Sequence, residues 1–186
     1  MRIRQMGDPV LREISTAVNK DDLNSTEVQT AIQDMQTALQ GIRAISPANG
    51  TAISAPQVGI NKRMVMLRSG DDFHVLINPR IIEASTEMFE FVEECFSLYY
   101  LRGVVQRHQS VTVAFENTTG QTQTEGFEGD KAGIVQHEID HLDGVLFVDK
   151  VIDTLHISTV DYHYRDRPQR LQEVKEMYAY MAGITN

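Results

Sequence analysis

The sequence predicts an α+β fold in which mostly antiparallel β-sheets pack around a central helix, with another helix towards each end of the chain. Three observations support this class: a helical apolar stripe near the N-terminus, a middle region of short strand-like segments, and two further helical segments after it. The 186 residues suit a single domain that spans positions 1–186.

The first expected helix covers residues 25–42. Its apolar residues recur at helical spacing, and Asn24, Ser25 or Thr26 can cap its start. Proline and glycine after position 46 break the pattern. The apolar stripe consists of Val28, Ile32, Met35, Leu39 and Ile42.

The middle of the chain is typical of β-structure. Residues 117–120, Asn-Thr-Thr-Gly, resemble a hairpin turn. Together with the short spacing between the segments, this turn favours antiparallel pairing. The expected strands cover 63–68, 73–77, 80–84, 87–92, 103–107, 111–116 and 121–128.

Two more helices are expected after the strands. The first covers residues 130–143, where Asp130 can cap the start and Gly144 can end the helix. The last covers about 168–182, beginning at Pro168 and ending before Gly183.

The strongest chemical signal lies in the expected 130–143 helix. His137, Glu138 and His141 form the pattern His-Glu-x-x-His, whose two imidazoles fall one helical turn apart on one face. Imidazoles so placed can bind one divalent ion, and the glutamate beside them can transfer a proton to or from a water molecule. The alternative interpretation is a solvated polar helix face.

A catalytic site of this kind needs a third protein ligand. Phe147 occupies the third ligand position of the extended metalloprotease pattern and cannot bind metal. Glu173 and Glu176 are the downstream glutamates left for a thermolysin-like site. Cys95 is the remaining candidate, since thiolate binds zinc and ferrous iron well, although a buried core cysteine is an equally good interpretation from spacing alone.

Composition limits the functional classes. A net charge of −9 argues against nucleic acid as a direct partner. The single cysteine fits a reducing compartment. The N-terminal residues lack the apolar run of a signal peptide, and no stretch approaches the roughly 18 apolar residues of a membrane span, so we expect a cytoplasmic protein without a membrane segment.

Three motifs together resemble the peptide deformylase family. Residues 50–57, GTAISAPQ, are similar to the family's G-x-G-L-A-A-P-Q; residues 93–97, EECFS, are similar to E-G-C-L-S; and residues 136–142, QHEIDHL, match Q-H-E-x-D-H-L. The resemblance runs from about Gly7 to Val148, in the family's order and close to its spacing.

The resemblance implies a metal-dependent hydrolase that removes the formyl group from formylmethionyl nascent polypeptides. It implies one divalent ion per chain, natively Fe²⁺, with Zn²⁺, Ni²⁺ or Co²⁺ as substitutes. It also implies contact between the C-terminal helix and the ribosome, for which a solvated charged face is the alternative. The implied metal ligands are Cys95, His137 and His141; the catalytic groups are Glu138, Gln57 and the backbone N–H of Phe96; and the substrate-binding residues are Gly50, Ala52, Glu94 and Arg102.

The sequence departs from the family pattern at Ala52, Ser54 and Glu94, of which Ala52 and Glu94 replace glycines. Glycine often marks a close approach of backbone to ligand, so we hypothesise an intact metal site beside an altered substrate groove. The alternative is that Glu94 points to solvent and activity is normal. Two rival functions follow from these departures: an amidase acting on another N-acyl substrate, and a weakly active protein that binds peptide N-termini.

Overall fold

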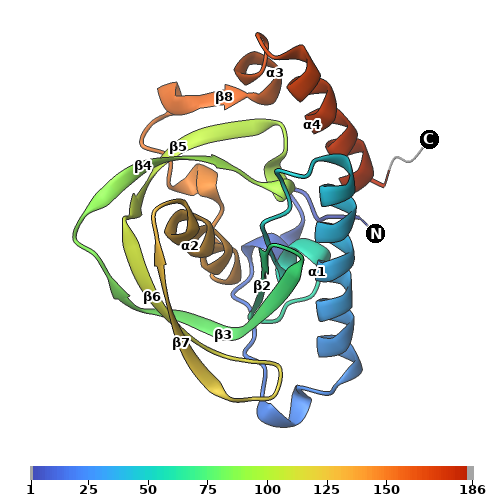
Figure 1. Cartoon of the computed structure of the whole chain (residues 1–186), viewed down its shortest axis with the longest axis vertical. Helices are drawn as coiled ribbons and strands as arrows, with labels where there is room; N and C mark the ends of the chain where they lie inside the picture. The colour runs from blue at the N-terminus through green and yellow to red at the C-terminus, as the bar shows by residue number, and fades with distance from the viewer. Residues whose placement is uncertain (1, 184–186) are drawn as a thin grey trace.

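The computed structural model describes residues 2–183 and confirms an α+β fold with helices near both ends of the chain (Figure 1). Within these residues, strands β1 to β8 form two antiparallel sheets, ordered β1-β2-β3-β6-β7 and β4-β5-β8. The helices are α1 (Thr26–Ile45), α2 (Asp130–Leu142), α3 (Val160–His163) and α4 (Pro168–Met181). The strands are β1 (Ala52–Ser54), β2 (Met64–Ser69), β3 (Asp72–Ala84), β4 (Met88–Glu94), β5 (Leu101–His108), β6 (Ser110–Glu116), β7 (Thr122–Glu128) and β8 (Ile157–Thr159).

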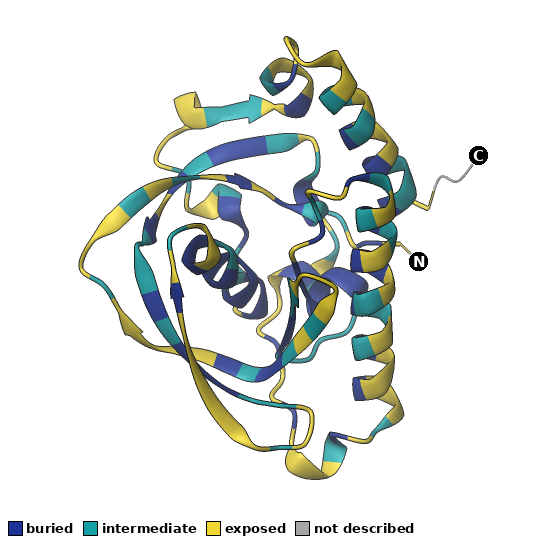
Figure 2. Ribbon diagram, in the orientation of Figure 1, coloured by how far each residue is buried: buried dark blue, intermediate teal, exposed yellow. Residues whose placement is uncertain are grey.

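Helix α2 lies at the centre of the molecule, between the two sheets, and most of it is buried (Figures 1 and 2). One apolar side packs on the large sheet, where Val135, Ile139 and Leu142 join a buried cluster with strand residues. The predicted cap at its start is wrong, because Asp130 is the first helical residue and Gly129 holds the cap position with φ of 55°. Since most of the helix is buried, polar residues on its other faces need buried partners.

The terminal regions of the described chain meet beside α1. Ser25 caps α1 by accepting a hydrogen bond from the Val28 N–H, and α4 packs along α1 with Val174, Met177 and Met181 in a shared core (Figure 1). The Ile3 N–H donates to the Met181 carbonyl at 3.0 Å. No helix among residues 2–183 combines the length and the apolar content that a membrane crossing requires.

The sheets differ from expectation in two ways. The predicted strands 73–77 and 80–84 form one strand, β3, whose register with β6 shifts between Ile77 and Arg80. Asn78 adopts a φ of 52° at this irregularity, and its side chain bonds both the N–H and the carbonyl of Val18. Strands β1 and β8 were not predicted, because three residues carry no readable alternation.

Gly144, which follows the C-terminal cap of α2, is the glycine whose replacement should cost most in stability. Its φ is +72°, and a Cβ there would lie 2.6 Å from the Arg12 carbonyl oxygen, a backbone atom that cannot move aside. We expect Gly144→Ala to lower the free energy of unfolding by about 3 kcal/mol in urea denaturation. Gly70→Ala is the matched control, since Gly70 has a φ of +62° and open space around it; its cost should be only about 1 kcal/mol. Equal losses in the two variants would show that the contact with Arg12 is unimportant.

Candidate metal centre

The structure brings the three predicted ligands together in one buried cluster. His137 and His141 project from one face of α2, and Cys95 follows the end of β4. One ligand atom from each residue lies within 4.8 Å of the other two, and the Cys95 Sγ is 3.1 Å from His141 Nε2. All three side chains are buried. Because its sulfur lies beside the imidazole of His141, Cys95 is not a core residue remote from the histidines.

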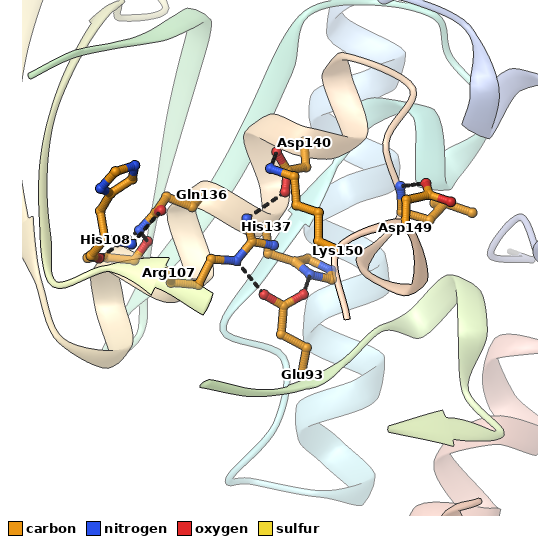
Figure 3. Close-up of polar contacts among 10 residues, drawn as sticks. Glu93, Arg107, His108, Gln136, His137, Asp140, Asp149 and Lys150 are labelled. Atoms are coloured by element: carbon orange, nitrogen blue, oxygen red, sulfur yellow. Dashed lines mark hydrogen bonds and ion pairs between the residues drawn. The ribbon is translucent and has the colours of Figure 1, made fainter. Parts of the chain in front are cut away.

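A buried network of charges orients His137 from behind (Figure 3). Its Nδ1–H donates to Glu93 Oε2 at 2.6 Å, which leaves Nε2 free to face Cys95. The Arg107 Nε donates to the other oxygen of Glu93, and the Arg107 Nη1 donates to Asp140, both at 2.6 Å. Lys150 donates to Asp140 in turn, at 2.7 Å (Figure 3). A carboxylate behind a histidine is the arrangement that fixes the tautomer of a metal ligand.

The two histidines have opposite pKa shifts. Burial opposes charge on His137, but the carboxylate of Glu93 and the sulfur of Cys95 outweigh it and raise its pKa well above the ordinary value. Burial, with the nearby His137 and Arg107, lowers the pKa of His141 far below the ordinary value. A neutral imidazole has a lone pair on one of its two ring nitrogens, and Nε2 is the nitrogen of His141 that faces Cys95.

Glu138 lies beside the cluster on α2 with one carboxylate oxygen unused. Within residues 2–183, its Oε2 is buried and has no hydrogen-bond partner. Burial raises the pKa of Glu138 to about 7. A carboxyl group with such a pKa exchanges protons readily near neutral pH.

Gln57 presents an amide N–H₂ group towards the cluster. Its Oε1 accepts a hydrogen bond from the Ser54 N–H at 2.9 Å, and because a backbone N–H can only donate, this bond fixes the orientation of the amide. The Nε2 therefore lies 3.7 Å from the Cys95 Sγ and 3.3 Å from the Ser97 Oγ. Ser54, one of the departures from the family pattern, adds a hydroxyl contact to the same Oε1.

Phe96 begins the short 3₁₀ helix Phe96–Leu98 directly after Cys95. The backbone of this turn is directed at the sulfur, since the Ser97 N–H donates to Cys95 Sγ at 3.4 Å. The carbonyl of Phe96 is held by Gln5 Nε2 at 2.9 Å. Gln5, near the N-terminus, therefore holds this turn in place.

A pocket of about 180 Å³ opens next to the cluster. The predicted residues Gly50, Ala52 and Glu94 line it. Arg102, which the resemblance also places in the groove, is not in this lining: it is 2% exposed and pairs with Glu94, which lines the pocket. The full lining is Asn49, Gly50, Thr51, Ala52, Gln57, Phe91, Val92, Glu93, Glu94, Cys95, Phe96, Ile134, His137 and Glu138.

The sequence analysis did not identify Glu93 and Arg107 as residues that support the metal site. A signal was present: Phe89, Phe91 and Glu93 share one face of a strand, so Glu93 is a charged residue on an apolar face. Such a residue requires a buried partner of opposite charge.

The residues fit a resident divalent ion. Ligand bonds of about 2.0–2.3 Å place the ligand atoms of a tetrahedral site roughly 3.5 Å apart, a spacing that Cys95, His137 and His141 approach. Within the described part of the chain, Glu138 Oε2 is a buried polar atom in the same place that lacks a partner. A thiolate with two imidazoles is a donor set for zinc or ferrous iron.

Comparisons with known proteins agree with this chemistry. The family model described as polypeptide deformylase matches residues 1–156. The chain is 39% identical over 150 residues to the peptide deformylase of Acetivibrio thermocellus, covering 81% of this chain and 82% of the relative.

Two solved structures have the same fold. A class I type b peptide deformylase from Acinetobacter baumannii, with Met-Ala-Ser bound, has a TM-score of 0.70 and 32% identity, covering 81% of this chain and 98% of that one. A peptide deformylase from Synechococcus elongatus in complex with actinonin has a TM-score of 0.70 and 29% identity, covering 100% and 87%.

Proposed function

This chain belongs to the peptide deformylase family and is a metal-dependent deformylase, and we propose that Cys95, His137 and His141 hold its ion while Glu138 moves the protons. The observation that carries the proposal is the convergence of a thiol and two imidazoles, distant in sequence, beside a buried carboxyl group with a free oxygen.

The proposed reaction cleaves the C–N bond of a formamide, releasing formate and a free amine. A divalent ion held by Cys95, His137 and His141 would polarise a carbonyl group and lower the pKa of water towards about 7. Glu138 accepts a proton from the attacking water and later delivers it to the departing amine nitrogen. In the metal-free protein, burial raises the pKa of Glu138 to about 7, and its carboxyl group can both take up and return a proton.

Gln57 and Phe96 are proposed as donors to the oxygen that becomes negative as water adds to the formyl carbon. The Gln57 amide is fixed by Ser54, so its Nε2–H is already aimed at the site before substrate arrives. The Phe96 N–H lies in the turn that surrounds the sulfur. Losing one such donor typically raises the barrier by about 3 kcal/mol.

We propose formylmethionyl nascent polypeptides as the substrate, the cytoplasm as the location, and Fe²⁺ as the native ion, with Zn²⁺, Ni²⁺ or Co²⁺ as substitutes. The pocket beside the cluster, with Phe91, Val92 and Ile134 in its lining, supports an apolar first side chain. Neither another N-acyl substrate nor a role restricted to binding peptides is favoured by the comparisons.

The proposed contact with the ribosome has weaker support than its alternative, a solvated charged face. Three of the basic residues on and near α4 are paired with acidic neighbours, whereas the Arg167 guanidinium lies 5.9 Å from the centre of the Tyr164 ring. The pairs are Arg165 with Asp166, Arg170 with Glu173, and Lys175 with Asp161.

Formate release tests the proposal. Protein loaded with Ni²⁺ should release one formate for each formyl-Met-Ala-Ser consumed, and a chelator should abolish the activity until metal is added back. His137→Ala should hold less than about a tenth of the metal of the parent protein and lose activity in parallel. Stoichiometric metal without formate release would contradict the proposal and favour one of the two rival functions.

A further inference from the structure

The last described part of the chain contacts two of the residues that line the pocket. This C-terminal segment, residues 157–181, comprises β8, α3 and α4, and it follows the last residue that the family model matches. We propose that the C-terminal segment positions the rim of the substrate pocket, with Tyr164 and Arg102 as positioning residues that hold the Glu94 carboxylate away from bound peptide. The inference rests on the proposed function, since it concerns the binding of peptide at that pocket.

Glu94 lies at the end of β4 and points to the opposite side of the strand from Glu93. Successive side chains of a strand alternate in direction, and Glu93 points to His137 and α2. Arg102 is the residue directly opposite Glu94 on β5, and the two form an ion pair. The Glu94 side chain stays 36% exposed at the pocket while the Arg102 side chain is 3% exposed. The Arg102 side chain therefore contacts Glu94, a residue that lines the pocket, and does not itself face the pocket interior.

Tyr164 connects this ion pair to the C-terminal segment. Arg102 Nη2 donates to the Tyr164 hydroxyl at 2.6 Å, and that hydroxyl donates to Glu94 Oε1 at 3.2 Å. The Arg102 guanidinium carbon also lies 4.4 Å from the centre of the Tyr164 ring. Both partners of Glu94 therefore converge on a single carboxylate oxygen.

The position of Tyr164 is set by the pairing of β8 with β5. Ser158 lies opposite Arg102 in this pairing, and the Val160 N–H donates to the Tyr100 carbonyl at 3.0 Å. Tyr164 then ends α3, with 5% of its surface exposed. A rigid backbone connection thus leads from the sheet edge to the hydroxyl that contacts Glu94.

The other rim of the pocket is held by α4. Asn49, which lines the pocket, donates to Ser46 Oγ at 2.9 Å and contacts Met177 Sδ at 3.5 Å. Arg170 of α4 donates to the same Ser46 Oγ at 2.8 Å. The C-terminal segment therefore contacts both rims, through side chains that the family-matched residues do not supply.

Release of Glu94 should weaken peptide binding more than it slows the chemical step. An unpaired carboxylate is free to turn into a pocket that already contains Glu138, where its charge repels acidic substrate side chains and its length obstructs the peptide backbone. Within the described residues, no hydrogen bond joins the metal ligands or Glu138 to Tyr164 or Arg102, so turnover of bound substrate should change little.

Three variants test the inference on formyl-Met-Ala-Ser. Arg102→Met should raise KM about fivefold with kcat within about twofold of the parent. Adding Glu94→Gly to Arg102→Met should return KM to within about twofold of the parent, because the released carboxylate is then gone. Tyr164→Phe, which keeps the ring and folds more safely, should raise KM by a smaller factor. Tyr162→Phe is the matched control, since Tyr162 is 61% exposed in the same segment.

A binding measurement separates this inference from the proposed function. The dissociation constant of the tripeptide Met-Ala-Ser, measured by calorimetry on Ni²⁺-loaded protein, should follow the same order as KM and requires no turnover. Absence of formate release from the parent protein would overturn the proposed function only. The positioning role would be overturned if KM and the dissociation constant stayed unchanged in Arg102→Met and Tyr164→Phe, even if thermal stability fell. It would also be overturned if adding Glu94→Gly to Arg102→Met did not restore the two constants.

Discussion

Glu138→Gln is expected to lower kcat for deformylation by about 10²- to 10⁴-fold while the metal stays bound. Glutamine keeps the size of the side chain and removes its ability to accept and return a proton. Because Glu138 is not one of the three clustered ligands, elemental analysis should find the same metal content in variant and parent. The loss therefore isolates proton transfer from metal binding.

A second glutamate variant serves as the control for Glu138→Gln. Glu128→Gln changes an exposed glutamate at the end of β7 and should leave kcat within about twofold of the parent. A Glu138→Gln enzyme with kcat within about threefold of the parent, at full metal content, would require a different group to carry the proton. KM should change little in either variant, because the side chain keeps its volume.

Glu93→Gln is expected to weaken both the fold and the metal site. Removing the charge leaves the buried Arg107 with Asp140 as its remaining acidic partner among residues 2–183, and breaking a buried ion pair typically costs about 3–5 kcal/mol. His137 also loses the carboxylate that orients its ring, which should lower metal affinity by about 10- to 100-fold. Urea denaturation of the metal-free protein and competition with a chromogenic chelator measure the two effects separately.

A double variant distinguishes the two roles of Glu93. Replacing both Glu93 and Arg107 with methionine removes the buried pair as a unit, so stability should recover most of the loss. Metal affinity should stay low, because the methionine thioether is uncharged and only a weak acceptor for the His137 Nδ1–H. Glu90→Gln, an exposed change on the same strand, is the control. Recovery of metal affinity in the double variant would show that Glu93 acts on stability alone.

Local patterns predicted most of the fold. The helices α1, α2 and α4 were predicted within a few residues because their apolar spacing and ends are encoded in adjacent residues. Strand β8 was not predicted, since it exists only by pairing with β5, more than 50 residues earlier in the chain. Two strands, 73–77 and 80–84, were expected where the structure has the single irregular strand β3, and the Asn78 side chain between them bonds to Val18.

The candidate site was predictable to the extent that its chemistry is encoded in short motifs. His137, Glu138 and His141 form one helical motif, and Cys95 joined them through the family resemblance; the structure places all four together. The placement of Arg102 could not be derived, because its partner Tyr164 lies 62 residues away and outside any motif. Glu94 likewise has a charge partner that only the β4–β5 register identifies.

The pairing of β8 with β5 also bears on how the protein is made. Synthesis proceeds from the N-terminus, so residues 101–103 emerge from the ribosome well before residues 157–159 that cover them. Until then, one side of β5 presents unpaired N–H and carbonyl groups, the kind of exposed strand that promotes aggregation. A newly made chain is thus most vulnerable just before the residues after 156 fold, and a chain cut after residue 156 would keep that vulnerability permanently.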